Sequence, residues 1–167
     1  MQIPTDEKQL AALFLRLGAK DPGGWARSQV KDGINQLHRF LFLRAAWSNV
    51  ISEDDQRWID QSVVSSKQSP AEPFSGVGQA LNRLLAAGAS RDDIVDVVRG
   101  MQAELLFGLC YLLDDPSLDD PALADLGWKL VETDTDFAPT KKPIGGLHES
   151  VLEMDPSGRE MRSRRAP

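Results

Sequence analysis

The sequence has a single cysteine and no long apolar run. Cys110 cannot form an internal disulfide, and a buried, unreactive thiol is expected because it lies inside the most apolar stretch, residues 105–113. That stretch is about half as long as a membrane-spanning helix needs to be. Asp6 and Glu7 stand where a secretory signal would carry positive charge. We therefore expect a protein of the reducing cytoplasm that does not interact with a membrane.

Basic residues are too few for a general nucleic-acid binder. The chain has 19 Lys and Arg against 25 Asp and Glu, which gives a formal net charge of −6 and a pI near 4.9. Binding to nucleic acid requires a basic face that neutralises phosphates. We therefore expect no nucleic-acid partner.

Motifs of catalysis and metal binding are also absent. The two histidines, His38 and His148, do not form the His-Glu-x-x-His pairing of zinc hydrolases. Asp134 and Asp136 match two positions of a calcium loop, but the glycine and the distant glutamate of that loop are missing. The Gly-x-Ser-x-Gly nucleophile motif does not occur. We therefore assign no catalytic residue, cofactor or metal site, and an enzymatic function is not favoured.

What the sequence does contain is helical apolar spacing along most of its length. Apolar residues recur every three or four positions over 5–17, 25–50, 52–63, 77–88 and 91–113, and Asp120-Pro121 is a typical start for a short helix to about residue 131. Residues 25–50 and 91–113 are apolar on more than one side, which indicates central helices. The fold class predicted is all-α: an irregular single-domain bundle of about six helices around these two, with a partly irregular C-terminal segment.

The C-terminal third differs in composition from the rest. Pro139, Pro143 and Gly145-Gly146 predict turns over residues 134–146, and residues 147–154 can form either a strand or one helical turn. We assign residues 1–156 to the helical bundle domain with one core. Residues 157–167 are rich in arginine and are expected to form a flexible tail.

The acidity of the chain is concentrated between residues 114 and 136. This segment has eight acidic side chains against one basic side chain, Lys129, and so a net charge of −7. Some of these acids fit ordinary helix capping, but Asp114 and Asp115 follow the C-terminus of a long helix, where the helix dipole disfavours negative charge. Trp128 lies within the same segment and is of the residue type enriched at binding hot spots.

These features predict a surface that binds a basic protein, because charge speeds the encounter and a large aromatic side chain prolongs the contact. The residues assigned to it are Asp114, Asp115, Asp119, Asp120, Asp125, Trp128, Asp134 and Asp136.

The predicted function is that of a non-enzymatic cytoplasmic protein-binding module. A specific form of this prediction is an immunity protein, a small acidic antagonist of a basic toxin or effector. Two alternatives stay open: a homodimeric helical scaffold with residues 105–113 at its interface, and a small metal-dependent helical hydrolase using Glu104, His38 and a nearby aspartate.

Overall fold

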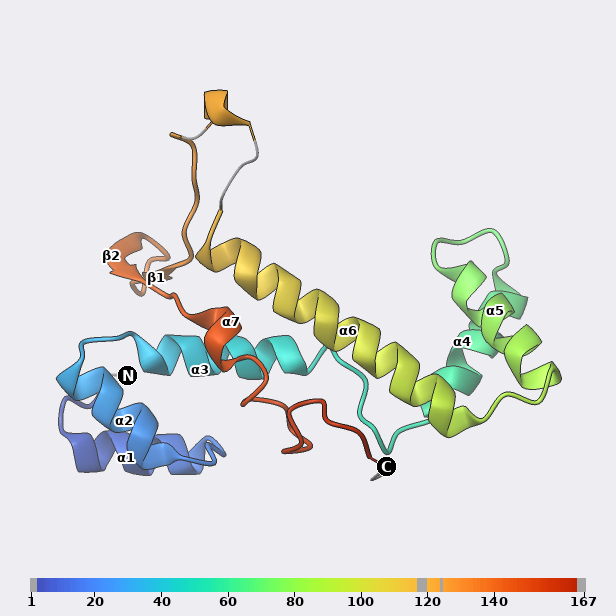
Figure 1. Cartoon of the computed structure of the whole chain (residues 1–167), viewed down its shortest axis with the longest axis horizontal. Helices are drawn as coiled ribbons and strands as arrows, with labels where there is room; N and C mark the ends of the chain where they lie inside the picture. Colours follow the sequence, from blue (N-terminus) through green and yellow to red (C-terminus); the bar gives the residue numbers. More distant parts are fainter. Residues whose placement is uncertain (1–2, 117–119, 124, 165–167) are drawn as a thin grey trace. The chain divides into compact units, whose positions relative to one another are not determined.

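The computed structural model describes residues 3–116, 120–123 and 125–164 (Figure 1). The chain forms two compact units: unit 1 comprises Met1–Trp47 and Leu106–Glu160, and unit 2 comprises Ser48–Leu105 and Met161–Pro167. The structure is mostly helical with one two-stranded sheet, so the predicted all-α class is confirmed. In the described part of the chain, no helix combines the length and apolarity that crossing a membrane requires.

Unit 1 begins with three helices, α1 (Glu7–Arg16), α2 (Pro22–Lys31) and α3 (Gln36–Trp47). Asp6 caps α1 by accepting a hydrogen bond from the backbone N–H of Gln9, as N-terminal aspartates commonly do. Phe14, Trp25 and Phe40 meet with ring centroids 5.5–5.9 Å apart and form the aromatic centre of the unit 1 core. Each of the three helices therefore contributes one aromatic ring to the same cluster.

The continuous helix predicted over residues 25–50 is wrong, because the chain turns between α2 and α3. Gly33 has a φ of +70°, a left-handed conformation that a helix interior does not allow. Side chains close the turn: Gln29 Oε1 accepts from the N–H of Leu37 at 2.7 Å, and Gln36 Nε2 donates to Ser28 Oγ at 2.9 Å. The apolar spacing continued across the turn and so concealed it.

The end of unit 1 contains the sheet, formed by β1 (Val131–Thr133) and β2 (Pro139–Pro143), which pair antiparallel. The helix predicted over residues 120–131 is wrong, since among the described residues of that range one turn of 3-10 helix forms, Pro121–Leu123. Of the turns predicted over 134–146, one forms between the two strands, where the N–H of Phe137 donates to the carbonyl oxygen of Asp134, while Pro139–Pro143 form β2. Helix α7 (Leu147–Ser150) follows, which decides residues 147–154 in favour of a helical turn.

Unit 2 contains α4 (Arg57–Gln68), α5 (Ser75–Ala86) and the first part of α6 (Arg91–Asp114). Its core consists of Ile59, Leu81, Ile94 and Val95, so each unit has a buried cluster of its own where the sequence predicted a single core. Helices α4 and α5 approach closely at Gly78, where an added Cβ would lie 2.0 Å from the carbonyl oxygen of Ser62. Only glycine allows that approach.

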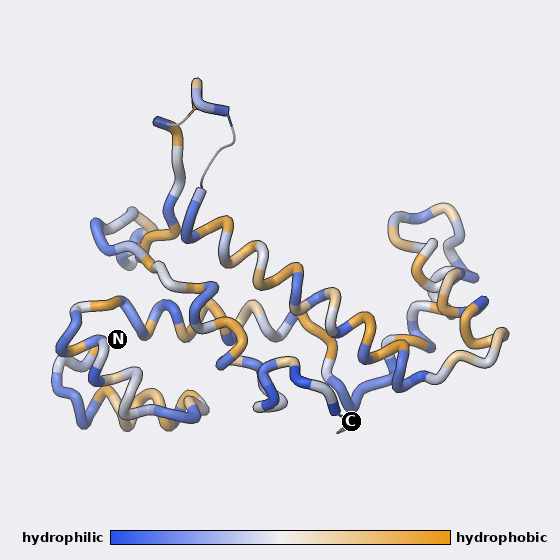
Figure 2. Tube along the Cα trace, viewed as in Figure 1, coloured by the Kyte–Doolittle hydropathy of each residue, from blue (hydrophilic) through white to orange (hydrophobic). Residues whose placement is uncertain are grey.

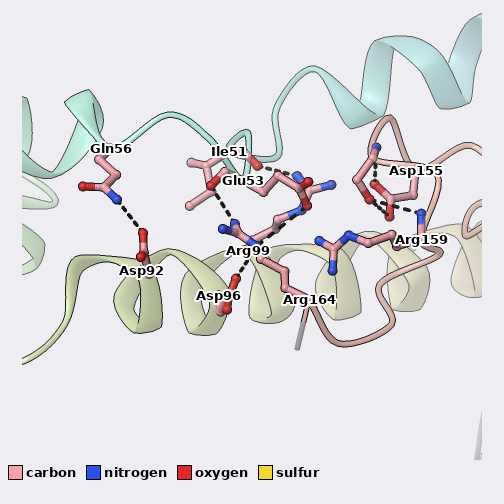
Figure 3. Close-up of polar contacts among 10 residues, drawn as sticks. Ile51, Glu53, Gln56, Asp92, Asp96, Arg99, Asp155, Arg159 and Arg164 are labelled. Carbon is pink, nitrogen blue, oxygen red and sulfur yellow. Dashed lines mark hydrogen bonds and ion pairs between the residues drawn. The ribbon is translucent and has the colours of Figure 1, made fainter. Parts of the chain in front are cut away.

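Polar side chains tie the loop before α4 to the first part of α6 (Figure 3). Arg99, which is buried, donates to the carbonyl oxygen of Ile51. Arg164 donates to the carbonyl oxygen of Glu53 and lies 2.9 Å from Asp96. Arg164 belongs to the segment for which the sequence predicts a flexible tail; that prediction stays open, since residues 165–167 lie outside the described part of the chain.

Helix α6 buries one side and exposes the other. Its exposed side is largely apolar and carries residues at helical spacing: Val97, Met101, Leu105, Leu109 and Leu112. Figure 2 shows hydrophobic residues along most of this helix. The sequence predicts a helix surrounded by core at this place, whereas Val97, Met101 and Leu105 are exposed in unit 2 and Leu109 and Leu112 are exposed in unit 1.

Candidate protein-binding surface

The last turns of α6, which belong to unit 1, expose four large apolar side chains. Phe107, Leu109, Tyr111 and Leu112 are between 38% and 49% exposed. Residues three or four positions apart are neighbours on a helix surface, so Phe107 lies beside Tyr111, and Leu109 lies beside Leu112. The two pairs lie on different sides of the exposed part of the helix, since successive residues are rotated by about 100°, and exposed apolar side chains of this kind are typical of protein-interaction sites.

Trp128 extends this apolar surface. Its indole N–H donates a hydrogen bond to the carbonyl oxygen of Leu112 at 2.8 Å, which holds the ring against the last turn of α6. The Trp128 side chain remains partly exposed, and Leu126 beside it in the sequence is exposed. We name the set formed by Phe107, Leu109, Tyr111, Leu112, Leu126 and Trp128 the α6-end surface; all six belong to unit 1.

Asp114, the first of the predicted acidic residues, serves an internal contact. Its side chain is only 6% exposed, and its Oδ2 lies 2.7 Å from Nδ1 of His148 and accepts from the His148 backbone N–H at 2.9 Å. The His148 ring also packs edge-on against Tyr111, with ring centroids 5.1 Å apart. Asp114 thus fixes α7 to the end of α6, and its charge is largely withdrawn from the surface.

Three acids that follow Asp114, namely Asp115, Asp120 and Asp125, are exposed. Asp115 lies at the end of α6 near the Tyr111 hydroxyl, at 3.5 Å, and Asp125 lies three residues before Trp128. Asp120 is exposed too, and its Oδ1 accepts from the backbone N–H of Ala122 at 2.9 Å, so it also closes the 3-10 turn. Asp119 lies outside the described residues.

Asp134 and Asp136 belong to the hairpin between β1 and β2. Oδ1 of Asp134 accepts from the N–H groups of Asp136 at 2.9 Å and of Ala138 at 3.0 Å, an ordinary aspartate turn. Asp136 is exposed in that turn. Hairpin geometry therefore accounts for Asp134, and within the part of the chain that the structure describes the hydrogen bonds of Asp134 stay inside the hairpin.

Glu132 shows why the net charge of the segment overstates its free negative charge. Its side chain is 13% exposed, accepts from Asn35 Nδ2 at 3.1 Å and lies 3.5 Å from Lys142 Nζ. Nδ1 of His38 is also 3.5 Å from Glu132, and 2.6 Å from Asn35 Oδ1. These partners lie far from Glu132 in sequence, so no local signal could have found them.

The cysteine at this end of α6, Cys110, is buried. Burial, and then the charge of Asp114, raise the pKa of Cys110 to about 11, so the thiol is neutral at physiological pH. Across residues 3–116, 120–123 and 125–164, no three His, Cys, Asp or Glu side chains are placed to hold a metal ion together.

The fold and this surface define a small all-α protein with an exposed patch that is apolar at its centre and acidic beside it. No protein-family model, curated protein or solved structure matches the chain. The functional argument therefore depends on the geometry of the surface itself.

Proposed function

We propose that this protein is a protein-binding module whose α6-end surface binds a helix that is apolar on one face and basic beside it. The observation that carries the proposal is the exposure of Leu109, Leu112 and Trp128 together at one place of unit 1. A helix that places its apolar face on such a patch buries anchors at the spacing of one or two turns. Binding of this kind removes apolar surface from water, which is the main favourable term in protein association.

Charge favours a basic partner over a second copy of this chain. Asp115, Asp120 and Asp125 are exposed in the segment that joins α6 to Trp128, and that segment contains no Lys or Arg, since Lys129 follows Trp128. In a two-fold dimer the same surface would face itself and bring these carboxylates together, in addition to the net charge of −6 on each chain. A basic helix would instead be attracted before contact.

A specific form of this proposal is an immunity-type protein of the cytoplasm that neutralises a basic toxin or effector. The support is physical: a neutral buried thiol suits a reducing compartment, and an acidic binding surface suits fast capture of a basic protein. Affinity purification from the native host, followed by identification of the bound protein, tests this form.

The binding surface itself can be tested with a helical Leu/Lys peptide of about five turns and a Leu/Glu peptide with the same apolar face. Isothermal titration calorimetry should show binding of the Leu/Lys peptide and little binding of the Leu/Glu peptide. The variant Leu109→Gln/Leu112→Gln keeps every charge and should weaken binding by about tenfold or more. The variant Asp115→Asn/Asp120→Asn/Asp125→Asn should slow association and flatten its dependence on salt.

Leu15→Gln is the matched control, since Leu15 is an equally apolar residue that is 66% exposed on α1. Equal losses in the control and in the double variant would show that the peptide binds without regard to the α6-end surface. Light scattering gives the alternative outcome: a wild-type dimer that Leu109→Gln/Leu112→Gln dissociates would mean that a second copy covers the surface.

A further inference from the structure

Unit 1 also contains an open cavity of about 700 Å³, within the size range of small-molecule sites. Residues of α2, of the turn before α3 and of β2 line it. Val30, Ile34 and Pro143 form an apolar wall, and Arg39 contributes a guanidinium group. The cavity and the α6-end surface share no residue.

Arg39 is a buried cation with weak partners. The residue is 8% exposed, yet its Nη1 lies 3.4 Å from Ser150 Oγ and 4.0 Å from Glu149 Oε2, both at the long end of useful contacts. Its Nε has no hydrogen-bond acceptor among the described residues. Burial lowers the pKa of Arg39, and the charges of Glu149 and Asp114 offset only part of that effect. A buried guanidinium in this position lacks a close anion.

The remaining charges of the cavity are mostly positive. Lys141 and Lys142 line it from β2, and Glu132 is the acidic residue in the lining. Glu132 already has partners in Lys142 and Asn35. Three basic groups against one acid give the cavity a positive potential that favours an anionic ligand.

The position of Arg39 depends on a glycine. An added Cβ at Gly146 would lie 2.0 Å from Nη2 of Arg39, and the φ of Gly146 is +70°, which side chains other than glycine rarely adopt. The backbone therefore leaves room for the guanidinium at the edge of the cavity.

We propose that this cavity binds a small organic anion, a monocarboxylate with an apolar body, with the carboxylate at Arg39 and the apolar body against Val30 and Ile34. Arginine suits this role because its planar fork matches a carboxylate. The ligand would supply the acceptor that Arg39 lacks and would exclude water from the apolar wall.

Phenylacetate and its neutral counterpart phenylacetamide are the probes for this proposal, added to the full chain at constant ionic strength. Phenylacetate should raise the melting temperature by a few degrees in a saturable way, because a ligand that binds only the folded state stabilises it. Phenylacetamide should leave the melting temperature unchanged. Arg39→Met and Ile34→Trp, which narrows the cavity, should each abolish the phenylacetate effect.

Arg44→Met is the matched control, since Arg44 is an exposed arginine on the same helix that donates to the carbonyl oxygen of Leu17. Its response to phenylacetate should equal that of the wild type. Equal effects of the two probes, or none from phenylacetate, would overturn the proposal. If Arg39→Met does not fold by circular dichroism, Ile34→Trp decides: undiminished binding in that variant would also overturn it.

Discussion

Each unit buries an arginine, and the two guanidinium groups are held differently. In unit 2, Arg99 donates directly to the carbonyl oxygen of Ile51 and ties a loop to α6. In unit 1, the contacts of the Arg39 guanidinium with described residues are the long ones to Ser150 and Glu149, beside an open cavity. A buried cation with a close carbonyl acts as a structural tie, whereas one with distant partners retains capacity for a ligand.

Two closely packed glycines, Gly78 in unit 2 and Gly146 in unit 1, also differ in whether the group they face can move. Gly78 in unit 2 faces backbone, the carbonyl group of Ser62, which cannot move without separating α4 from α5. Gly146 in unit 1 faces the end of the Arg39 side chain, which can move. The close contact at Gly78 therefore cannot relax, whereas the contact at Gly146 can relax by a movement of the Arg39 side chain.

Gly78→Ala should have the largest effect on stability. The added methyl group would collide with the Ser62 carbonyl, and overpacking against backbone costs about 3 kcal/mol of unfolding free energy. Urea unfolding followed by circular dichroism measures it. Gly76→Ala, on the same helix with open space around it, should be neutral or slightly stabilising. Equal stabilities of the two variants would refute the close approach of α4 and α5.

Arg99→Met should cost about 2 kcal/mol, because a buried carbonyl loses its charged donor. The same urea titration measures the change. Arg83→Met, at an exposed arginine of α5, should change the unfolding free energy by less than about 0.5 kcal/mol. A loss no greater than that control would mean that Arg99 is not a structural tie.

Gly146→Ala should cost about 1 kcal/mol for the left-handed backbone, and it should also displace the Arg39 guanidinium. Weaker phenylacetate binding should accompany the lower stability. Gly18→Ala is the control, since Gly18 also belongs to unit 1, has a φ of +89° with open space for a Cβ, and does not line the cavity. Calorimetry with both variants separates the two effects, and unchanged binding in Gly146→Ala would contradict this account of Arg39.

Arg39→Met should change the unfolding free energy by less than about 1 kcal/mol without ligand, since the residue has no short hydrogen bond to lose. Urea unfolding of Arg39→Met and Arg99→Met under identical conditions compares the two losses of unfolding free energy. A loss as large as that of Arg99→Met would make both arginines structural ties and remove the contrast between the units.

The smallest expected effect is that of an arginine at the surface of unit 2, Arg57, on the pKa of its partner Asp55. Hydrogen bonds from Arg57 lower the pKa of Asp55 to about 2. Because the pKa of Asp55 is lowered in the folded state, the Asp55–Arg57 pair contributes to the stability of the fold above the ordinary carboxyl pKa of about 4. This contribution to stability is lost as the pH falls toward 2. NMR titration of Asp55 should show the low midpoint, and Arg57→Gln should raise it. An unchanged midpoint in that variant would rule out Arg57 as the cause.

Local sequence patterns predicted the helices whose apolar spacing and caps agree. Helix α1 is confirmed inside the expected range 5–17, and α6 lies within one residue of the expected 91–113. The prediction failed at Gly33, where the apolar spacing continues on both sides of a turn, and at β1, which forms by pairing with β2. Pairing between distant segments leaves no local periodicity.

The candidate surface was predictable only in part. Trp128 and the exposed acids lie in the expected segment, but the sequence did not show that Asp114 would bond to His148, which is 34 residues away. The sequence analysis placed residues 105–113 at an interface only in the alternative of a homodimeric scaffold, because an apolar helix was otherwise expected to be covered by the core. Arg39 carried no signal, since its importance comes from burial and from the cavity beside it.

Trp128 gives the α6-end surface an intrinsic optical reporter. Trp128 is 39% exposed, whereas Trp25 and Trp47 are 6% and 3% exposed. Acrylamide in solution should therefore quench the emission of Trp128 in preference to those two indoles. Any partner that covers the last turn of α6 would shield this fluorophore and shift its emission to shorter wavelength, so occupancy could be followed without attaching a dye.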